Sequence, residues 1–199
     1  MFYKGEKLKG FMGSLSDLQG LGPHVRKELA SRLPHDDVKV LDVGTGSAGN
    51  AEFLARSLSK RSRIWTLDPS REVLAEARKT LAAKGLSSRI EFVQASASET
   101  GLKGEFFEYV ISVMTLHHIE DLRPAIGEMM RVLKTHGKIL LVDYKPEAVD
   151  KLHFAIRHTK PDFFTSSLVT GILRDEGARV LTRDFDLWYL VEATTSATN

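Results

Sequence analysis

From residue 38 onward, short runs of apolar and β-branched residues alternate with longer segments in which apolar residues recur every three or four positions. This alternation predicts parallel strands joined by crossover helices, and such apolar strands are typical of a sheet covered on both faces. Five strands are expected in this region: Val38–Val43, Ile64–Leu67, Ile90–Val93, Tyr109–Val113 and Lys138–Val142. The helices expected between them are Gly49–Leu58, Arg71–Lys84 and Leu122–Leu133. The pattern therefore predicts a doubly wound α/β fold.

Toward its end the chain departs from this alternation. A helix at Phe163–Glu176, stopped by Gly177, precedes two strand-like runs at Arg179–Phe185 and Leu187–Ala193. Parallel strands need a connection of a dozen or more residues, and the gap between these two runs is far shorter. We therefore expect an antiparallel hairpin, and a seven-stranded, mostly parallel sheet whose last strand is antiparallel.

The two ends of the chain lie outside this pattern. Leu15–Leu33 predicts one or two helices, whereas Thr194–Asn199 is short and polar and is expected to fray. Three parts are accordingly expected: an N-terminal helical cap or lid over residues 1–34, the main domain over 35–193 and a flexible tail over 194–199. Gly85 and Gly137 follow two predicted helices, where a positive φ closes the last turn without steric cost.

Composition narrows the choice of function. The 199 residues include no cysteine, which excludes disulfides, thiolate metal sites and a cysteine nucleophile. Met1–Gly13 holds no apolar run long enough for a signal peptide or a membrane span, so a cytoplasmic protein with no membrane partner is expected. The formal charge of +2 argues against a nucleic-acid partner. Histidines and carboxylates are not spaced as metal ligands, so no metal site is expected.

A glycine-rich loop carries the clearest chemical signal. Gly44, Gly46 and Gly49 form G-x-G-x-x-G between a predicted strand and a predicted helix, the context in which this motif is typical of a nucleotide site. The alternative is a tight strand-to-helix turn with no ligand. Asp68 ends the next strand, where a carboxylate can hydrogen-bond a ribose diol, although it could instead cap the helix after Pro69.

Asp42 distinguishes between the possible nucleotides. It lies two residues before Gly44, at the carboxyl end of a buried strand. A carboxylate here would repel the pyrophosphate of NAD, whereas it would attract the α-ammonium of S-adenosylmethionine, directly or through a water. A structural carboxylate bonded to backbone amides is the alternative. The loop therefore favours S-adenosyl-L-methionine as the cofactor.

At this point the sequence resembles the class I, Rossmann-like methyltransferases, particularly the small-molecule branch related to the ubiquinone and menaquinone biosynthesis enzymes. Residues 40–46 (VLDVGTG), 67–70 (LDPS), 92–97 (FVQASA) and 110–119 (VISVMTLHHI) resemble the first four motifs of that family. Ser96 stands where many relatives have an aspartate for the adenine amino group, and His136 replaces a glycine in a turn far from the chemistry. The resemblance implies cofactor binding by Asp42, Gly44, Thr45, Gly46, Gly49, Asp68, Pro69, Ser96, Ala97 and Ser112.

Methyl transfer from a sulfonium is an in-line displacement whose leaving group needs no proton, so positioning can supply most of the acceleration. A base is needed only for a protonated hydroxyl or a weakly acidic carbon. His117 and His118 follow the fourth strand and are the candidate catalytic residues, although such a pair is more often a packing element that orients the loop, with one ring bonded to backbone. Asp143 and Tyr144 end the fifth strand and could contact the acceptor, or Asp143 could cap a turn.

The expected acceptor is a small organic molecule. Residues 112–115 (SVMT) lack the Asn/Asp-Pro-Pro-Tyr sequence of enzymes that methylate exocyclic amines, and the missing cysteines remove thiol-dependent branches. Met1–Pro23 and Asp143–Phe163 contain aromatic residues that could form a lid and an acceptor pocket, or simply pack on the sheet. A homodimer is possible on this evidence. The competing functions are an NAD(P)-dependent oxidoreductase with the same loop and a cofactor-binding protein without turnover.

Overall fold

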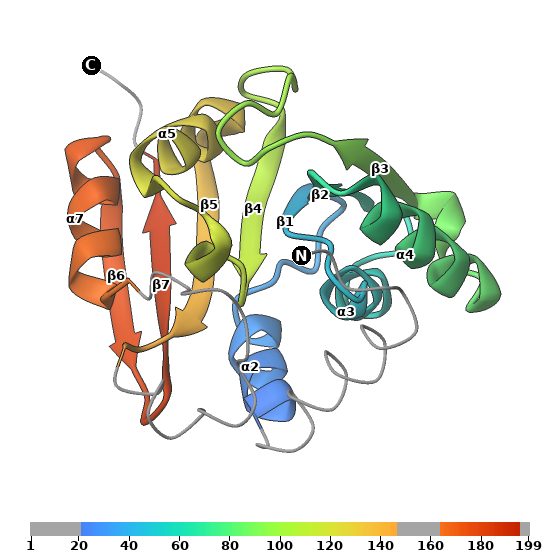
Figure 1. Ribbon diagram of the computed structural model, residues 1–199, viewed down its shortest axis with the longest axis horizontal. Helices are drawn as coiled ribbons and strands as arrows, with labels where there is room; N and C mark the ends of the chain where they lie inside the picture. The colour runs from blue at the N-terminus through green and yellow to red at the C-terminus, as the bar shows by residue number, and fades with distance from the viewer. Residues whose placement is uncertain (1–20, 147–163, 196–199) are drawn as a thin grey trace. The chain divides into compact units, whose positions relative to one another are not determined.

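The computed structural model describes residues 21–146 and 164–195, which Figure 1 draws in colour. The chain forms two compact units divided between Ala95 and Ser96. The strands are hydrogen-bonded in the order β3-β2-β1-β4-β5-β7-β6. β7 is antiparallel to both of its neighbours, whereas the pairs β1–β2, β2–β3 and β4–β5 are parallel. The expected seven-stranded, Rossmann-like α/β sheet with an antiparallel last strand is therefore confirmed.

The first unit contains three parallel strands and the helices that join them. In chain order its elements are α2 (Leu21–Ala30), β1 (Lys39–Val43), α3 (Gly49–Ser57), β2 (Arg63–Asp68), α4 (Arg71–Ala83), η1 (Ser87–Arg89) and β3 (Ile90–Gln94). α3 packs against β2, and α4 packs against β2 and β3. The Ser70 hydroxyl accepts the N–H of Val73 and so caps the start of α4, while Gly85 ends this helix region with φ 70°.

The second unit contains four strands. In chain order its elements are β4 (Phe107–Val113), η2 (Leu116–His118), α5 (Leu122–Val132), β5 (Leu133–Tyr144), α7 (Ser166–Asp175), β6 (Arg179–Asp184) and β7 (Trp188–Thr194). α7 runs along the β6–β7 hairpin and also contacts α5 (Figure 1). Gly177 follows α7 with φ 81°, as expected of a helix stop. β7 reaches Thr194, the first residue of the expected tail, and Thr195 donates to the carbonyl of Gly137.

The turn before the main part of β5 differs from the expectation. Gly137 does not adopt a positive φ; the left-handed residue is His136, with φ 62°, and it is exposed. The pairing with β4 jumps here, from Phe107 opposite Leu133 to Tyr109 opposite Lys138. Position 137 instead needs glycine because there is no room for a side chain: a Cβ here would lie 2.7 Å from the Leu133 Cγ. The prediction of a helix stop at Gly137 was therefore wrong.

Several expectations fall on residues that lie outside the described ranges. They are most of the N-terminal lid, the acceptor segment from residue 147 to 163 and the last four residues of the tail. In the described part of the predicted Leu15–Leu33 helical segment, α2 is present. No helix in the described ranges has the length and apolar character that a membrane crossing requires.

Candidate functional site

The glycine loop of the first unit joins β1 to α3 and is anchored to β2. The N–H groups of Gly44 and Thr45 both donate to the Leu67 carbonyl, at 2.9 and 3.0 Å. Gly44 has φ 92° and Gly46 has φ 47°, conformations in which a side chain would be strained. The turn therefore needs glycine at these two positions, and its backbone can approach a ligand closely.

Asp42 lies beneath this loop, inside β1, and is completely buried. Its Oδ1 accepts the Asn50 amide N–H at 2.5 Å and its Oδ2 accepts the Thr66 hydroxyl at 2.8 Å. Thr45 Oγ1 lies 2.8 Å from Thr66 Oγ1, and since Thr66 donates its single proton to Asp42, Thr45 donates to Thr66. The partners of Asp42 in this network are side chains rather than the backbone amides of the structural alternative.

Burial raises the pKa of Asp42 from 3.8 to about 6 against the opposing effect of the Asn50 and Thr66 hydrogen bonds. The carboxylate of Asp68, which also lies in this unit, raises it further. A cation bound at the loop would oppose both causes, because it stabilises the ionised form of Asp42. The electrostatics of the loop therefore favour a ligand whose nearest group is positive.

Asp68 ends β2 and remains partly exposed. Its Oδ1 accepts the Ser70 N–H at 2.9 Å and its Oδ2 accepts the Gly46 N–H at 3.3 Å. Burial raises the pKa of this carboxyl above its ordinary value, and the backbone hydrogen bonds partly oppose the shift. The helix cap is Ser70 rather than Asp68, so the capping alternative for Asp68 was wrong. Pro69, beside it, is exposed, and its carbonyl accepts the Gln94 amide at 3.5 Å.

The start of α3 differs from the other helix starts described. Its N-cap, Ala48, has φ 67° and supplies no side-chain hydrogen bond, whereas Ser70, Asp121 and Thr165 cap α4, α5 and α7. Helix N–H groups without a capping side chain can bind an anionic or polar ligand group. The Gly49 backbone, at the first position of α3, is partly exposed.

Three predicted cofactor residues lie in the second unit. Ser96 is exposed, and its hydroxyl lies 2.9 Å from the Ser98 hydroxyl. Ala97 is partly exposed in the turn between Ser96 and Glu99, whose backbones form an isolated antiparallel bridge. Ser112 lies within β4 and its side chain is completely buried. Cofactor contact by these residues stays a prediction.

His117 and Asp143 form a buried pair in the same unit. The His117 Nδ1 lies 2.7 Å from the Asp143 Oδ1, and the His117 backbone N–H donates to Asp143 Oδ2 at 3.1 Å. His117 is 8% exposed and Asp143 1% exposed. The ring of His117 is thus bonded to a side-chain carboxylate, and Asp143, inside β5, ties η2 to this strand by accepting a backbone N–H of η2 as well.

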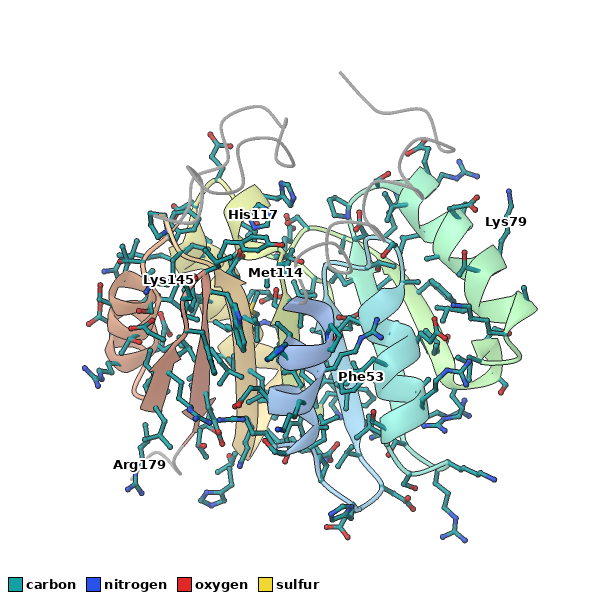
Figure 2. All side chains as sticks on the ribbon, turned by 90° about the horizontal axis from the view of Figure 1, so that it is seen from below. Phe53, Lys79, Met114, His117, Lys145 and Arg179 are labelled. Atoms are coloured by element: carbon teal, nitrogen blue, oxygen red, sulfur yellow. The ribbon has the colours of Figure 1, made fainter. Side chains whose placement is uncertain are left out.

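Two further aromatic side chains, His118 and Tyr144, lie near His117 at one end of this unit. His118 is exposed, with its ring centroid 4.1 Å from that of His117, and the Tyr144 ring lies 5.9 Å from His117. Burial, with a smaller effect of the Asp143 charge, raises the pKa of Tyr144 to about 12. Figure 2 shows His117 and Lys145 toward one end of the unit and Arg179 at the other. Because η2 follows β4, this is the carboxyl end of β4 and β5, where open α/β folds bind ligands.

The parallel strands, the glycine loop after β1 and the carboxylate that ends β2 define a Rossmann-like, nucleotide-binding class of α/β protein. The chain belongs to the methyltransferase domain family, whose family model matches residues 41–141. S-adenosyl-L-methionine is therefore the cofactor, and the described residues fit it: a positive group suits the carboxylates, and the glycines of the turn carry no side chains that would keep a ligand from its backbone. The alternative of an NAD(P)-dependent oxidoreductase is not supported.

Known proteins are similar in sequence or in fold. The ubiquinone/menaquinone biosynthesis C-methyltransferase UbiE of Rickettsia massiliae is 29% identical over 135 residues, which cover 65% of this chain and 54% of that protein. The chain thus spans about half the length of the curated relatives it matches. The crystal structure of the YcgJ protein from Bacillus subtilis has a TM-score of 0.75 at 16% identity, covering 88% of this chain and 99% of that one. A SAM-dependent methyltransferase from Aquifex aeolicus has a TM-score of 0.72 at 20% identity, covering 85% and 88%.

Sequence reasoning did not find two of the residues that organise the site. Asn50 and Thr66 hold both oxygens of Asp42, yet neither belongs to the motif that identified the loop. Asp143 was considered for acceptor contact or capping but not as the partner of His117. A polar residue at a buried strand position, as Thr66 is in β2, was the available signal, since such groups need hydrogen-bond partners.

Proposed function

We propose that this protein methylates a small organic acceptor and that His117 removes the proton of that acceptor. The observation that carries the proposal is the hydrogen bond between His117 Nδ1 and Asp143 Oδ1, 2.7 Å long and buried. Within its own unit, this pair lies where the carboxyl ends of β4 and β5 are, and the cofactor of the family supplies an activated methyl group when bound.

The carboxylate determines which nitrogen of His117 can act as a base. An ionised carboxylate only accepts hydrogen bonds, so the proton of the neutral imidazole resides on Nδ1. Nε2 is then the basic atom of the ring. As this nitrogen takes up a proton, the adjacent carboxylate stabilises the imidazolium, which is how a carboxylate supports a histidine base.

A base of this kind indicates the type of acceptor atom. A neutral amine attacks a methyl group with its own lone pair, whereas a phenol, an alcohol or an enolisable carbon must first lose a proton. The proposal is therefore O- or C-methylation. The similar protein from Rickettsia massiliae is named as a C-methyltransferase, which supports an acceptor of this chemistry.

The test is methyl transfer from labelled S-adenosylmethionine to three panels of small acceptors: phenols, enolisable ketones and primary amines. We expect product from the first or second panel, and His117→Gln to lower kcat by about 10²-fold or more, the usual contribution of a general base. The affinity for S-adenosylhomocysteine should be unchanged. Asp143→Asn should lower kcat and displace the acidic limb of the pH profile, since it alters the stabilisation of the imidazolium.

His118→Gln is the matched control, because this adjacent histidine is exposed. Equal losses in both histidine variants, or product from amines alone with full activity of the His117 variant, would refute the assignment of the base. Cofactor binding without product from any panel would instead favour a binding protein without turnover. A small acceptor also predicts activity that depends little on salt, unlike that of a nucleic-acid enzyme. The homodimer and the cytoplasmic location stay predictions.

A further inference from the structure

The guanidinium of Arg26, in α2, lies beside the first residue of α3. A Cβ placed on Gly49 would lie 3.9 Å from the Arg26 Nη2 and 3.6 Å from the Ser47 hydroxyl. These two polar side chains thus flank the space that the missing side chain of Gly49 leaves open. Both belong to the first unit, as does the whole glycine loop.

Arg26 is exposed, and the structure gives it no hydrogen bond or ion pair among the described residues. Some other arginines of the described ranges form ion pairs, among them Arg32 with Glu28, Arg56 with Glu52 and Arg131 with Glu128, whereas Arg26 keeps its charge available. The preceding residue, Val25, is buried, and so is Leu29 one turn later. These apolar contacts fix the rotation of α2, and with it the direction in which Arg26 leaves the helix.

We propose that Arg26 binds the α-carboxylate of the cofactor's amino-acid end. The proposal rests on the S-adenosylmethionine assignment and adds the group that recognises its only anion. Asp42 suits the ammonium and Asp68 the ribose, but neither can hold a carboxylate, which both would repel. A guanidinium at the start of α3 supplies the missing positive charge, and its planar fork matches the geometry of a carboxylate.

The position of the cation also fits the order of groups in the ligand. In S-adenosylmethionine the ammonium and the carboxylate share one carbon atom, so their partners must lie close together on the protein. Asn50, which holds the Asp42 Oδ1, directly follows Gly49, beside which Arg26 lies. The negative and positive partners of the amino-acid end therefore meet at the first two residues of α3.

The experiment compares two ligands on wild type and Arg26→Gln by calorimetry. S-adenosylhomocysteine carries the amino-acid end, whereas 5′-methylthioadenosine keeps the nucleoside and thioether but has no carboxylate or ammonium. We expect Arg26→Gln to weaken S-adenosylhomocysteine by about tenfold, the range of a charge-assisted hydrogen bond at a partly exposed site. The affinity for 5′-methylthioadenosine should stay at the wild-type value, and Arg26→Lys should restore part of the loss.

Lys27→Ala is the matched control, since Lys27 is the neighbouring exposed cation on α2 and its replacement also removes one positive charge. It should leave both affinities unchanged. Equal weakening of both ligands by Arg26→Gln, or an unchanged affinity for S-adenosylhomocysteine, would overturn the proposal while the cofactor assignment stood. Equal affinities of wild type for 5′-methylthioadenosine and S-adenosylhomocysteine would also overturn the proposal, because the carboxylate would then add nothing to binding. Failure of wild type to bind either ligand would refute the cofactor assignment itself.

Discussion

Replacing Asp42 with asparagine removes a negative charge from beneath the glycine loop while it keeps the size of the side chain. The carboxylate is completely buried and accepts hydrogen bonds from Asn50 and Thr66. An asparagine can keep both contacts if Asn50 turns its amide and presents its oxygen. The substitution therefore tests the charge of this residue rather than its packing.

The magnitude follows from the pKa of Asp42, which burial raises from 3.8 to about 6. This difference means that burial disfavours the ionised form by roughly 3 kcal/mol. A carboxyl whose pKa is raised in the folded state adds stability below its unfolded pKa and loses this contribution as the pH rises through its folded pKa. The free energy of unfolding of wild type should therefore fall, relative to the Asp42→Asn variant, between about pH 4 and pH 6.

Cofactor binding should show the opposite dependence on pH. The ammonium attracts only the ionised carboxylate, which at about pH 5 is roughly a tenth of the molecules if the pKa is about 6. Wild type should thus bind S-adenosylhomocysteine about tenfold more weakly at about pH 5 than at about pH 8. The Asp42→Asn variant should bind weakly at both values and show no such difference.

Calorimetry supplies the affinities and denaturant titration supplies the stabilities, both over the same range of pH. Asp36→Asn is the control, because Asp36 is an exposed aspartate of the same unit. Wild-type affinity in the Asp42 variant, or an affinity of wild type that is constant from about pH 5 to about pH 8, would show that the carboxylate does not recognise the ammonium.

Four further substitutions, all in the second unit, test the packing, the strain and the charges described above. Gly137→Ala, whose Cβ would lie 2.7 Å from the Leu133 Cγ, should lower the free energy of unfolding by about 1–3 kcal/mol. Gly171→Ala, within α7 and with nothing inside 4 Å, should raise it by roughly 0.5–1 kcal/mol; equal signs in denaturant titrations would contradict the packing argument. His136→Gly should relieve the φ of 62° and raise thermal stability by about 0.5–1 kcal/mol, and a lower melting temperature would exclude strain there. Glu128→Gln should lower the free energy of unfolding at neutral pH, because the hydrogen bond from Arg131 lowers the pKa of Glu128 to about 2. The difference in stability between wild type and this variant should shrink as the pH falls from 4.5 toward that value, and a difference that stays constant would argue against a charge effect.

Local pattern predicted most elements of the fold to within a few residues. The largest error lies at β5, which begins at Leu133 rather than at Lys138. The residues between them, Lys134 to Gly137, are mostly polar and carry no apolar alternation. Their extended conformation depends on the pairing of Leu133 with Phe107, a contact between distant parts of the chain that periodicity does not record.

Some residues of the candidate site could likewise be predicted from local sequence, whereas others could not. The glycines and Asp68 were predictable because a nucleotide loop requires them at fixed spacing after a strand. The sequence alone left open the alternative in which Asp68 caps the helix, since aspartate and serine both accept backbone N–H groups and only the geometry of α4 shows that Ser70 is the cap. Arg26 had no signal in the sequence at all, because a lone arginine in a helix is ordinary.

By itself, the sequence determined the order of strands and helices, the loop at Gly44 to Gly49 and the charge that favours a cationic ligand. These properties reside in residues close together in the chain, where backbone sterics and hydrophobic periodicity act. Only the tertiary structure decided that Asp42 meets Asn50 and Thr66, and that His117 meets Asp143. Such pairs form because buried polar groups require partners, and which partners they find depends on how distant segments pack.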